Sequence, residues 1–380
     1  MLNKKQISIL RVLNLPMIML FLFLNVPWFR AYFMAVGLRW IYILLFSFSL
    51  SFFLTPIFGS IARRFDILDI PDERKIHANS TPLLGGVVIM ISFCASLTAN
   101  MILETEMIVL LLGGFIVCIV GLVDDWKGIS AKLKLLIQIC VVLMLIYNGI
   151  ILDLFPIKTT WGYIANSIFT VIWIVGITNA MNFFDGMDGL ATGLSAIIAL
   201  FIGIVSFQTN QPFMGWIAIA VIGSCLGFFP FNFRPKKPAA IFLGDAGSTF
   251  LGFILAGLAI KGYWADNRPI VSFATPILIF WILIFDMTYI TVERVIAGKV
   301  KTLKQWIDYV GTDHLHHRLY ALLGDKKKAV LTIFLLSTTL GLSSIALRNA
   351  RMIDAIILVF QAFLIAIIVS VIEYAGRMKG

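Results

Sequence analysis

The chain has 380 residues, of which 60% are hydrophobic, and its mean hydropathy is strongly positive. A soluble domain cannot bury so much apolar surface, so the composition excludes a soluble protein and indicates a membrane protein. The formal net charge of +10 then bears on orientation in a membrane rather than on nucleic-acid binding.

Apolar runs of about 20 residues recur along the chain, and each is long enough to cross a hydrocarbon core of about 30 Å. They are continuously apolar, which favours helices over a β-barrel. We predict an all-α, polytopic integral membrane protein with about 11–12 transmembrane helices. The predicted spans are 12–29, 39–61, 83–102, 107–123, 134–152, 163–181, 189–207, 213–231, 247–262, 271–292, 329–347 and 353–373.

The first of these spans is the weakest. It is short and contains Asn14, Pro16, Asn25 and Pro27. We therefore divide the chain into an extra N-terminal segment, 1–38, with an optional additional span, and one membrane-embedded domain at 39–375. Four cysteines lie singly within apolar runs and predict neither a disulfide nor a thiolate metal site: Cys94, Cys118, Cys140 and Cys225.

The loops between the predicted spans divide into a basic side and a side with little charge. The basic side carries 23 of the 30 Lys and Arg residues, and positive loops stay in the cytoplasm. The same side carries all four histidines, His77, His314, His316 and His317. It also carries most acids near a span end: Asp124, Asp125, Asp185, Asp188, Asp245, Asp286, Glu293 and Asp313. We predict one active site at the cytoplasmic membrane surface.

Two neighbouring carboxylates, Asp124 and Asp125, follow the predicted span 107–123. They repel each other, and the negative end of the helix dipole lies at the same place. A cation or a polar role is needed to stabilise such a pair, so we interpret it as a functional acid pair. Ordinary ion pairs in a solvated loop, with Lys132 or Lys134, are the alternative.

A short turn, residues 179–191 (NAMNFFDGMDGLA), joins two predicted spans. Asn182, Asp185 and Asp188 recur every three residues, so a helical turn would place them on one face. Amide and carboxylate oxygens are suitable ligands for Mg²⁺. The alternative is that Asp185 or Asp188 only caps the next helix.

The stretch 242–249 (FLGDAGST) places Asp245 just before another predicted span. We interpret Asp245 as a metal carboxylate, because Mg²⁺ in phosphoryl chemistry is commonly held by few carboxylates together with substrate phosphates. Helix capping is the alternative. Upstream, residues 232–237 form a polar and basic rim that either contacts phosphate or only anchors the chain to the membrane.

Three histidines and an arginine stand together at 314–318 (HLHHR). Imidazole and guanidinium groups can cradle an anion, so we predict phosphate binding. A transition-metal site or a surface cluster without function are the alternatives. A further charged run at 72–77 (DERKIH) is also typical of attraction to anionic lipid headgroups, and the following Gly85 and Gly86 allow tight helix packing.

These motifs, in this order and spacing, resemble the polyprenyl-phosphate N-acetylhexosamine-1-phosphate transferases, a superfamily that includes phospho-N-acetylmuramoyl-pentapeptide transferase. The resemblance runs from about residue 40 to 375. It favours the branch that transfers GlcNAc-1-phosphate, because the muramoyl-pentapeptide branch typically has three consecutive histidines and Arg318 occupies the third position here. That family has eleven spans, so the segment before about residue 38 is extra.

The resemblance implies roles for individual side chains. Mg²⁺, or Mn²⁺ as a substitute, would be held by Asn182 and Asp245. The catalytic group would comprise Asp124, Asp125, Asp185, Asp188, His316 and His317. The substrate-binding residues would be Lys75, Thr81, Lys134, Asn232, Phe242, His314 and Arg318.

Within these sets the resemblance assigns contacts. Asp124 would be a base or a contact of the polyprenyl phosphate, and Asp188 would contact the nucleotide sugar. Phe242 would stack near the uracil. The pyrophosphate would be bound by His316, His317 and Arg318, with added positive charge from Lys75 and Lys134.

The implied reaction transfers N-acetylhexosamine-1-phosphate from a UDP-sugar to polyprenyl (undecaprenyl) phosphate and releases UMP. It would be the first membrane step in making a cell-envelope polysaccharide, such as teichoic acid or lipopolysaccharide. We expect a bacterial cytoplasmic (inner) membrane location with the site facing the cytoplasm. The expected partners are the UDP-sugar, the lipid and the membrane, without nucleic acid, and a homodimer is left open.

Two other classes compete with this interpretation. Carboxylates within membrane proteins often mark ion pathways, so a transporter with a cytoplasmic-side ion or anion site is the main alternative. Against it, the charged groups lie at one face and no inverted repeat is visible. A CDP-alcohol phosphotransferase is the second, but its Asp-Gly-x-x-Ala-Arg pattern is absent from the sequence.

Overall fold

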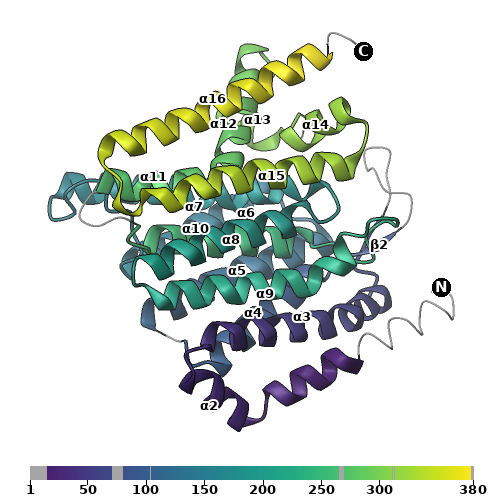
Figure 1. Ribbon diagram of the computed structural model, residues 1–380. Coiled ribbons are helices and arrows are strands. Elements are labelled where there is room, and N and C mark those ends of the chain that lie inside the picture. The colour runs from purple at the N-terminus through teal and green to yellow at the C-terminus, as the bar shows by residue number, and fades with distance from the viewer. Residues whose placement is uncertain are drawn as a thin grey trace.

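The computed structural model describes residues 15–70, 80–102, 104–264, 269–309, 311 and 313–377. Across these ranges the chain is almost entirely helical, and its only strands are the antiparallel two-residue pair β1–β2 (Figure 1). The prediction of an all-α polytopic membrane protein is confirmed. Seven of the described helices are long and apolar enough to cross a membrane, or nine if two bent helix pairs each count as one span.

The helices and strands follow one another without a long irregular segment in the described ranges. The first half contains the helix Leu15–Leu24, α2 (Pro27–Ala35), α3 (Arg39–Arg64), β1 (Leu68–Asp69), β2 (Thr81–Pro82), α4 (Gly85–Ala99), α5 (Thr105–Lys127), α6 (Ala131–Tyr147), α7 (Thr160–Phe183) and the 3₁₀ turn η1 (Phe184–Gly186). The second half contains α8 (Leu190–Gln208), α9 (Pro212–Asn232), α10 (Gly244–Lys261), α11 (Pro269–Ile279), α12 (Trp281–Ile296), α13 (Leu303–Asp308), α14 (Leu315–Leu323), α15 (Lys326–Ile345), η2 (Ala346–Asn349) and α16 (Met352–Arg377).

Each of the twelve predicted spans overlaps a helix or a bent helix pair. The count by length and composition is lower because α4 and α6 have only 15 and 17 residues, and because α10, with 18 residues, includes Asp245, Lys261 and several glycines that lower its hydropathy. At a rise of about 1.5 Å per residue, a helix of 15 residues is about 22 Å long, less than the thickness of a hydrocarbon core.

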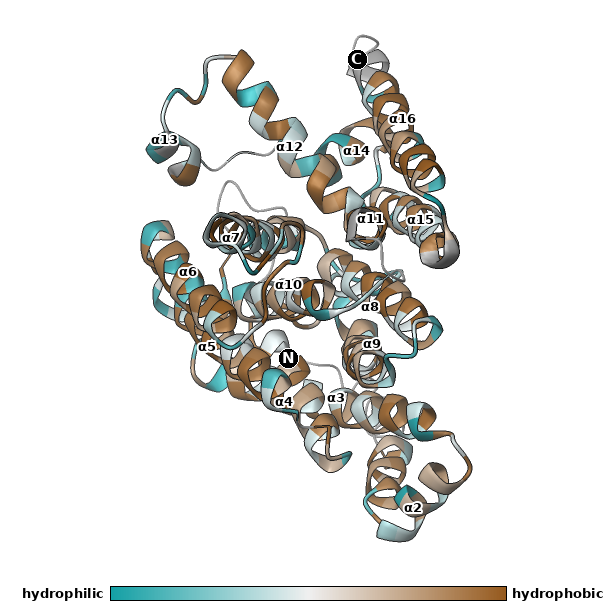
Figure 2. Cartoon of the chain, turned by 90° about the vertical axis from the view of Figure 1, so that its left-hand side faces the viewer, coloured by the Kyte–Doolittle hydropathy of each residue, from teal (hydrophilic) through white to brown (hydrophobic). Residues whose placement is uncertain are grey.

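The helix α10 lies in the middle of the bundle and is enclosed by α4, α5, α7 and α8 (Figure 2). All of its residues from 246 to 260 are buried. A helix that is apolar all round suits this position. Its small residues let neighbours approach closely: Gly252 faces the backbone of Thr178 on α7, and Gly257 faces Leu110 on α5. The fold therefore fixes the start of α10 firmly.

The predicted span 271–292 corresponds to two helices rather than to one. It breaks at Phe280 into α11 and α12, which are bent by 78°. Pro276 lies inside α11, one turn before the break. As a result α12 leaves the bundle and projects away from it, with α13 beyond its far end (Figure 2).

The extra N-terminal segment forms the other bent pair. The helix Leu15–Leu24 and α2 are bent by 71°. Leu24 at the bend packs against Tyr42 and Phe46 of α3, and the Tyr42 hydroxyl donates a hydrogen bond of 2.8 Å to the Leu24 carbonyl. This bond supplies a partner at the point where the helix ends. The segment is thus anchored along the outer side of α3 (Figure 1).

Candidate active site

The motif residues lie at one end of the helix bundle, the end at which β2 lies in Figure 1. They occupy the C-terminal ends of α5, α7 and α9 and the N-terminal ends of α6, α8, α10 and α14. The opposite end contains the ion pair between Lys261 and Glu106. The expectation that the separate motifs share one face of the molecule therefore agrees with the structure.

A lysine between two carboxylates forms the centre of the site. The Lys134 ammonium on α6 is paired with Asp124 at the end of α5 and lies 3.0 Å from Asp245 Oδ2 on α10. The three side chains retain partial exposure of 14–30%. Asn182 at the end of α7 completes the group, since its Nδ2 donates 2.9 Å hydrogen bonds to Asp245 Oδ1 and to the Ser248 hydroxyl.

Asp125 binds the backbone at the start of α10. Its two carboxylate oxygens accept hydrogen bonds from the backbone N–H groups of Asp245 (2.9 Å) and Ala246 (3.1 Å). Gly244 has a φ of +75°, and a Cβ there would lie 2.5 Å from Asp125 Oδ2. Asp125 thus caps α10 from a neighbouring helix and fixes the backbone that carries Asp245.

The expectation that Asn182, Asp185 and Asp188 share one helical face was wrong. The helix α7 ends at Phe183, Asp185 has non-helical dihedral angles (φ −80°, ψ 20°), and Gly189 is left-handed. The chain therefore turns between the three side chains. Asn182 bonds to Asp245, whereas Asp185 lies near the backbone N–H of Gly244.

The helix-capping alternatives for these acids were also wrong. The residue preceding α10 is Leu243 and the residue preceding α8 is Gly189, and neither helix has a side-chain cap of its own. Asp245 is the second residue of α10. Capping of α8 or α10 therefore does not explain the presence of the Asp185, Asp188 and Asp245 carboxylates.

Two polar side chains tie the loop after α9 to the start of α8. Asn232 is 2% exposed. Its Oδ1 accepts from the Gly189 N–H (3.1 Å) and the Thr192 hydroxyl (3.0 Å), and its Nδ2 donates to the Ile241 carbonyl (3.1 Å). Asp188 Oδ2 accepts from the Ala239 N–H at 2.9 Å. Asn232 uses its whole amide inside the protein, so the geometry gives it a structural contact first.

The segment 81–86 packs directly against the loop before α10. The Phe242 N–H donates to the Pro82 carbonyl at 2.8 Å, and the Phe242 carbonyl accepts from the Gly85 N–H at 3.1 Å. A Cβ on Gly86 would overlap the backbone of Gly247. The tight-packing interpretation of Gly85 and Gly86 is confirmed. Thr81 is buried within β2, and Lys75 lies outside the described residues.

The histidine segment reaches the same end of the bundle through the loop after α7. The His314 ring stacks on Phe183 at 5.0 Å, and the His316 ring lies 5.6 Å from Phe184. His316 Nε2 lies 2.6 Å from the position that a Cβ on Gly186 would take. His316 is 1% exposed, and neither ring nitrogen has a hydrogen-bond partner among the described residues. It is therefore a buried polar group without a partner next to the acidic loop.

Burial also sets the ionisation of this segment. The pKa of His316 is lowered well below its usual value, first by burial and then by the positive charge of His317, His314 and Arg318. The pKa of the half-buried His317 is lowered too, mainly by burial. His316 is therefore neutral at pH 7 in this structure.

Arg318 contacts the helices α12 and α16. Its Nε lies 3.3 Å from Glu373 on α16, its NH2 nitrogen lies 3.5 Å from Asp286 on α12, and its guanidinium lies 4.0 Å from the Tyr289 ring. The side chain is 3% exposed. In this conformation Arg318 joins α14 to α12 and α16.

The donor set fits Mg²⁺ only as a site shared with substrate. Among the described residues, no group of three or more His, Cys, Asp or Glu side chains is arranged to hold a metal ion. Asp245 and Asn182 are adjacent, and the carboxylates of Asp124 and Asp245 already surround one cation, the Lys134 ammonium. Such a site suits an ion that takes one or two protein oxygens and completes its shell with phosphate and water.

A small hollow opens beside Lys134. Its walls come from α5, α6 and α10, and its lining residues are Val117, Val120, Gly121, Lys134, Ile137, Gln138 and Thr249. Gln138 is fixed there by a 2.7 Å hydrogen bond from Asn179. The hollow therefore brings the Lys134 side chain together with apolar side chains of α5 and α6.

The chain is similar in sequence to known proteins. A profile of Glycosyl transferase family 4 matches residues 107–263. The chain is 36% identical over 313 residues to the probable undecaprenyl-phosphate N-acetylglucosaminyl 1-phosphate transferase of Bacillus subtilis, covering 81% of this chain and 84% of that protein. It is 30% identical to the decaprenyl-phosphate N-acetylglucosaminephosphotransferase of Mycolicibacterium smegmatis, covering 75% and 76%.

A second branch is also similar. The phospho-N-acetylmuramoyl-pentapeptide-transferase of Staphylococcus epidermidis is 31% identical over 241 residues, which cover 56% of this chain and 73% of that protein. With its helical bundle and its matches to both branches, the chain belongs to glycosyl transferase family 4, the membrane-embedded polyprenyl-phosphate sugar-1-phosphate transferases.

Proposed function

We propose that this protein transfers N-acetylhexosamine-1-phosphate, with GlcNAc-1-phosphate as the first choice, from a UDP-sugar to polyprenyl phosphate and releases UMP. The observation that carries the proposal is the Lys134 ammonium between Asp124 and Asp245, with Asn182 adjacent, at a helix-bundle end that also contains the histidines. The names of the relatives, which specify polyprenyl phosphates and N-acetylglucosamine phosphate transfer, support the choice of substrates.

The reaction is a phosphoryl transfer between two anions. A phosphate oxygen of the lipid attacks the β-phosphorus of the UDP-sugar, a new P–O bond forms, and the bond from that phosphorus to the bridging oxygen breaks. UMP leaves with the bridging oxygen and its electron pair. A phosphate monoester is mostly dianionic at neutral pH, since its second pKa is about 6, so the acceptor needs alignment more than it needs a base.

The charged cluster would provide that alignment. Lys134 would meet the phosphates, and Asp124, which also accepts a hydrogen bond from the Ile129 N–H, would hold Lys134 in place. Asp245 and Asn182 would hold Mg²⁺ together with the diphosphate. The bound ion would neutralise negative charge on the phosphates and so favour the departure of UMP.

The histidines would meet the diphosphate from the opposite side of the acidic loop. His316 is neutral, buried and without a protein partner, so it can donate one N–H to a phosphate oxygen. Positioned donors in a site that excludes water are effective in stabilising transferred charge. Arg318 would act by holding α14, given its contacts with Asp286 and Glu373.

The proposed location is the bacterial cytoplasmic membrane with this end of the bundle facing the cytoplasm. The nucleotide sugar is polar and would reach the site from water, whereas the polyprenyl chain would remain in the bilayer. The basic side chains at this end, among them Lys236 and Lys237 in the loop after α9 and Lys328 in the first turn of α15, support that orientation.

The test is UMP release by the purified protein given UDP-GlcNAc and undecaprenyl phosphate. We expect release that needs both substrates and Mg²⁺, with Mn²⁺ as a partial substitute. In Asp245→Ala the rate should fall by about 100-fold or more, because a group that stabilises transferred charge is lost. Asp245→Asn keeps the side-chain shape and should also be impaired.

Asp354→Ala is the matched control, since Asp354 pairs only with the nearby Arg351 and lies exposed on α16. It should leave the rate unchanged. Near-normal turnover in both Asp245 variants would refute the metal assignment. Uptake of UDP-GlcNAc into vesicles without UMP release would instead indicate a transporter, and a panel of UDP-N-acetylhexosamines would identify the sugar.

A further inference from the structure

A buried carboxylate on α12 stands outside the motifs described so far. Asp286 is fully buried, in a helix whose neighbours Leu283 and Ile290 are apolar. A carboxylate in such a place requires partners. It has them in the histidine segment: Asp286 Oδ2 lies 2.7 Å from His314 Nδ1, and Oδ1 accepts from the Leu315 N–H at 2.7 Å.

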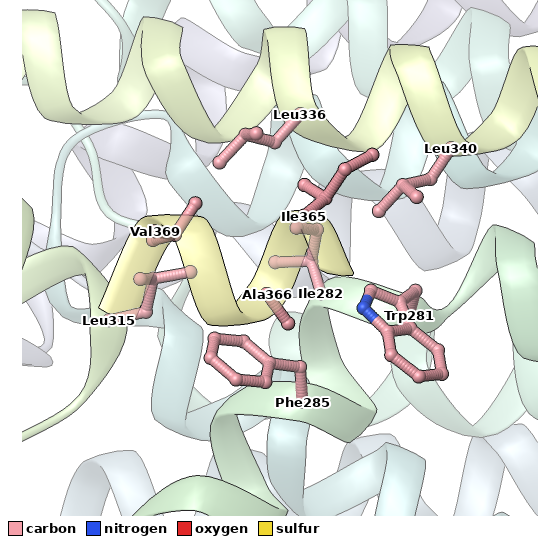
Figure 3. Close-up of a pocket in the computed structure, with 9 residues that line it drawn as sticks. All are labelled: Trp281, Ile282, Phe285, Leu315, Leu336, Leu340, Ile365, Ala366 and Val369. Carbon is pink, nitrogen blue, oxygen red and sulfur yellow. The ribbon is translucent and has the colours of Figure 1, made fainter. Parts of the chain in front are cut away.

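The second contact fixes the start of α14. His314 precedes this helix and provides no side-chain cap, so Asp286 takes the place of a cap from another helix. The Leu315 side chain is fully buried and lines an apolar pocket with Phe285 of α12 and Val369 of α16 (Figure 3). Backbone and side chain of Leu315 are thus both held by surrounding helices.

A third contact holds the residue just before the motif. Arg294 lies about two helical turns beyond Asp286 on α12. It donates two hydrogen bonds to Asp313, at 2.8 Å from Nε and 2.6 Å from NH2. The guanidinium also lies 4.3 Å from the centre of the Tyr309 ring. A bidentate pair of this kind fixes orientation as well as distance. The bend at Phe280 is what places α12 where it makes these contacts.

We infer that Asp286 is a positioning residue that sets the ring orientation and tautomer of His314 and so places His316 and His317 at the diphosphate. In the tautomer with the proton on Nδ1, His314 donates a hydrogen bond to Asp286 Oδ2, which leaves Nε2 as the nitrogen available to the site. A carboxylate holds the histidine of hydrolase triads in one tautomer by the same physical means. This inference rests on the proposed function for its substrate.

The structure also explains why Asp286 does not act on the substrate itself. It is completely buried, and its oxygens are used by His314 and the Leu315 N–H, with Arg318 at 3.5 Å. The His314 ring lies between Asp286 and the active-site loop, where it stacks on Phe183 and neighbours the His316 ring at 6.0 Å. Any effect of Asp286 on turnover therefore passes through the segment 314–318.

The test compares Asp286→Asn with Asp286→Ala in the purified full-length protein. The asparagine keeps the shape and an acceptor for the Leu315 N–H, but its NH₂ group faces His314 Nδ1 and requires the other tautomer. We expect kcat with UDP-GlcNAc and undecaprenyl phosphate to fall by about 100-fold in Asp286→Asn, with little change in KM and in melting temperature. A purely structural role would lower the melting temperature and leave kcat per folded molecule unchanged.

A matched control is available on the same helix. Thr288 is exposed, and its hydroxyl bonds only to the Ile284 carbonyl one turn earlier. Thr288→Val should retain wild-type kcat. If Asp286→Ala does not accumulate as folded protein, the isosteric Asp286→Asn decides. A kcat for Asp286→Asn within about twofold of wild type would overturn the inference.

A readout that needs no substrate separates this inference from the proposed function. Diethyl pyrocarbonate modifies accessible imidazoles, and mass spectrometry locates the product. We expect His316 to react slowly in the wild type and in Thr288→Val, and faster in both Asp286 variants. If the wild type releases no UMP but the four proteins still show this pattern of modification, the result would refute the function and support the positioning role. Unchanged modification together with normal turnover would refute the positioning role alone.

Discussion

At the residue scale, the site is built from charged groups that bind one another in the absence of substrate. Lys134 occupies the space between Asp124 and Asp245, and Asp125 and Asn182 fix Asp245 from two sides. The charges therefore need little rearrangement when a phosphate arrives, which is the condition under which electrostatic stabilisation is most effective. His316 differs from these groups, since it is buried without a partner.

The burial of His316 predicts a dependence of stability on pH. Its folded-state pKa is lowered, so at mildly acidic pH the unfolded chain binds the proton first, and stability is lost as the pH falls below about 6.5. We expect the melting temperature to decrease between about pH 7.5 and 5.5. Replacing the histidine in His316→Gln should flatten this decrease.

A graded control is provided by His317, whose pKa is lowered while its side chain is only half buried. His317→Gln should flatten the pH dependence to a smaller extent. The measurement is thermal unfolding in one detergent over a series of buffers. An equal acid sensitivity of wild type and His316→Gln would contradict the assignment of the effect to His316.

At the scale of elements, the start of α10 is positioned by backbone contacts rather than by long side chains. Gly86 of α4 faces the backbone of Gly247, and a Cβ on Gly121 of α5 would lie 2.6 Å from backbone atoms of Asp245 and Ala246. Only glycine permits helices to approach so closely. The glycines of the motifs are therefore explained by the packing that brings Asp245 to Lys134 and Asn182.

This packing predicts opposite effects for two glycine substitutions. Gly86→Ala should lower the free energy of unfolding by about 1–3 kcal/mol through overpacking, and should lower turnover because α10 is displaced. Gly176→Ala on α7 meets no atom within 4 Å and should raise stability by about 0.5–1 kcal/mol. Thermal unfolding and UMP release of both variants test this, and a neutral Gly86→Ala would contradict the close approach.

At the scale of the whole molecule, the end of the helix bundle that we propose as the active end is distinct from the opposite end. All described motif residues lie at the first, together with basic side chains in the first turns of α6 and α15 and in the loop after α9. The bend between α11 and α12 adds a helix that leaves the bundle and returns the chain to this end at α14 (Figure 2). Substrates in water and in the bilayer can thus meet at one membrane surface.

The orientation of the molecule can be tested with single cysteines in a variant whose four native cysteines are replaced. Lys328 is exposed at the active end, and Lys158 is exposed at the opposite end, before α7. We expect a membrane-impermeant maleimide to label Lys158→Cys in intact cells and Lys328→Cys only after the membrane is opened. The reverse pattern would place the active end outside and would refute the cytoplasmic site.

Several of the site residues could be predicted from the sequence because their local pattern is unusual. Adjacent carboxylates at Asp124 and Asp125, and Asp245 among small residues, have few structural explanations in a membrane protein. Asp286 was counted among the acids of this face but received no role, and Ser248 was not selected as a site residue. Both act through partners distant in the sequence, His314 and Asn182, and no local pattern announces such contacts.

The sequence by itself determined the membrane class, the helical content and the shared face of the motif residues, because hydropathy, span length and charge distribution are local properties. The tertiary structure alone decided how the acids divide their tasks. Asp125 caps α10, Asp188 holds a loop, and Asp124 and Asp245 meet at Lys134. These assignments depend on which helix ends become neighbours. Helix packing joins residues as distant in the sequence as Asp125 and Ala246, which are 121 positions apart, so no single segment encodes it.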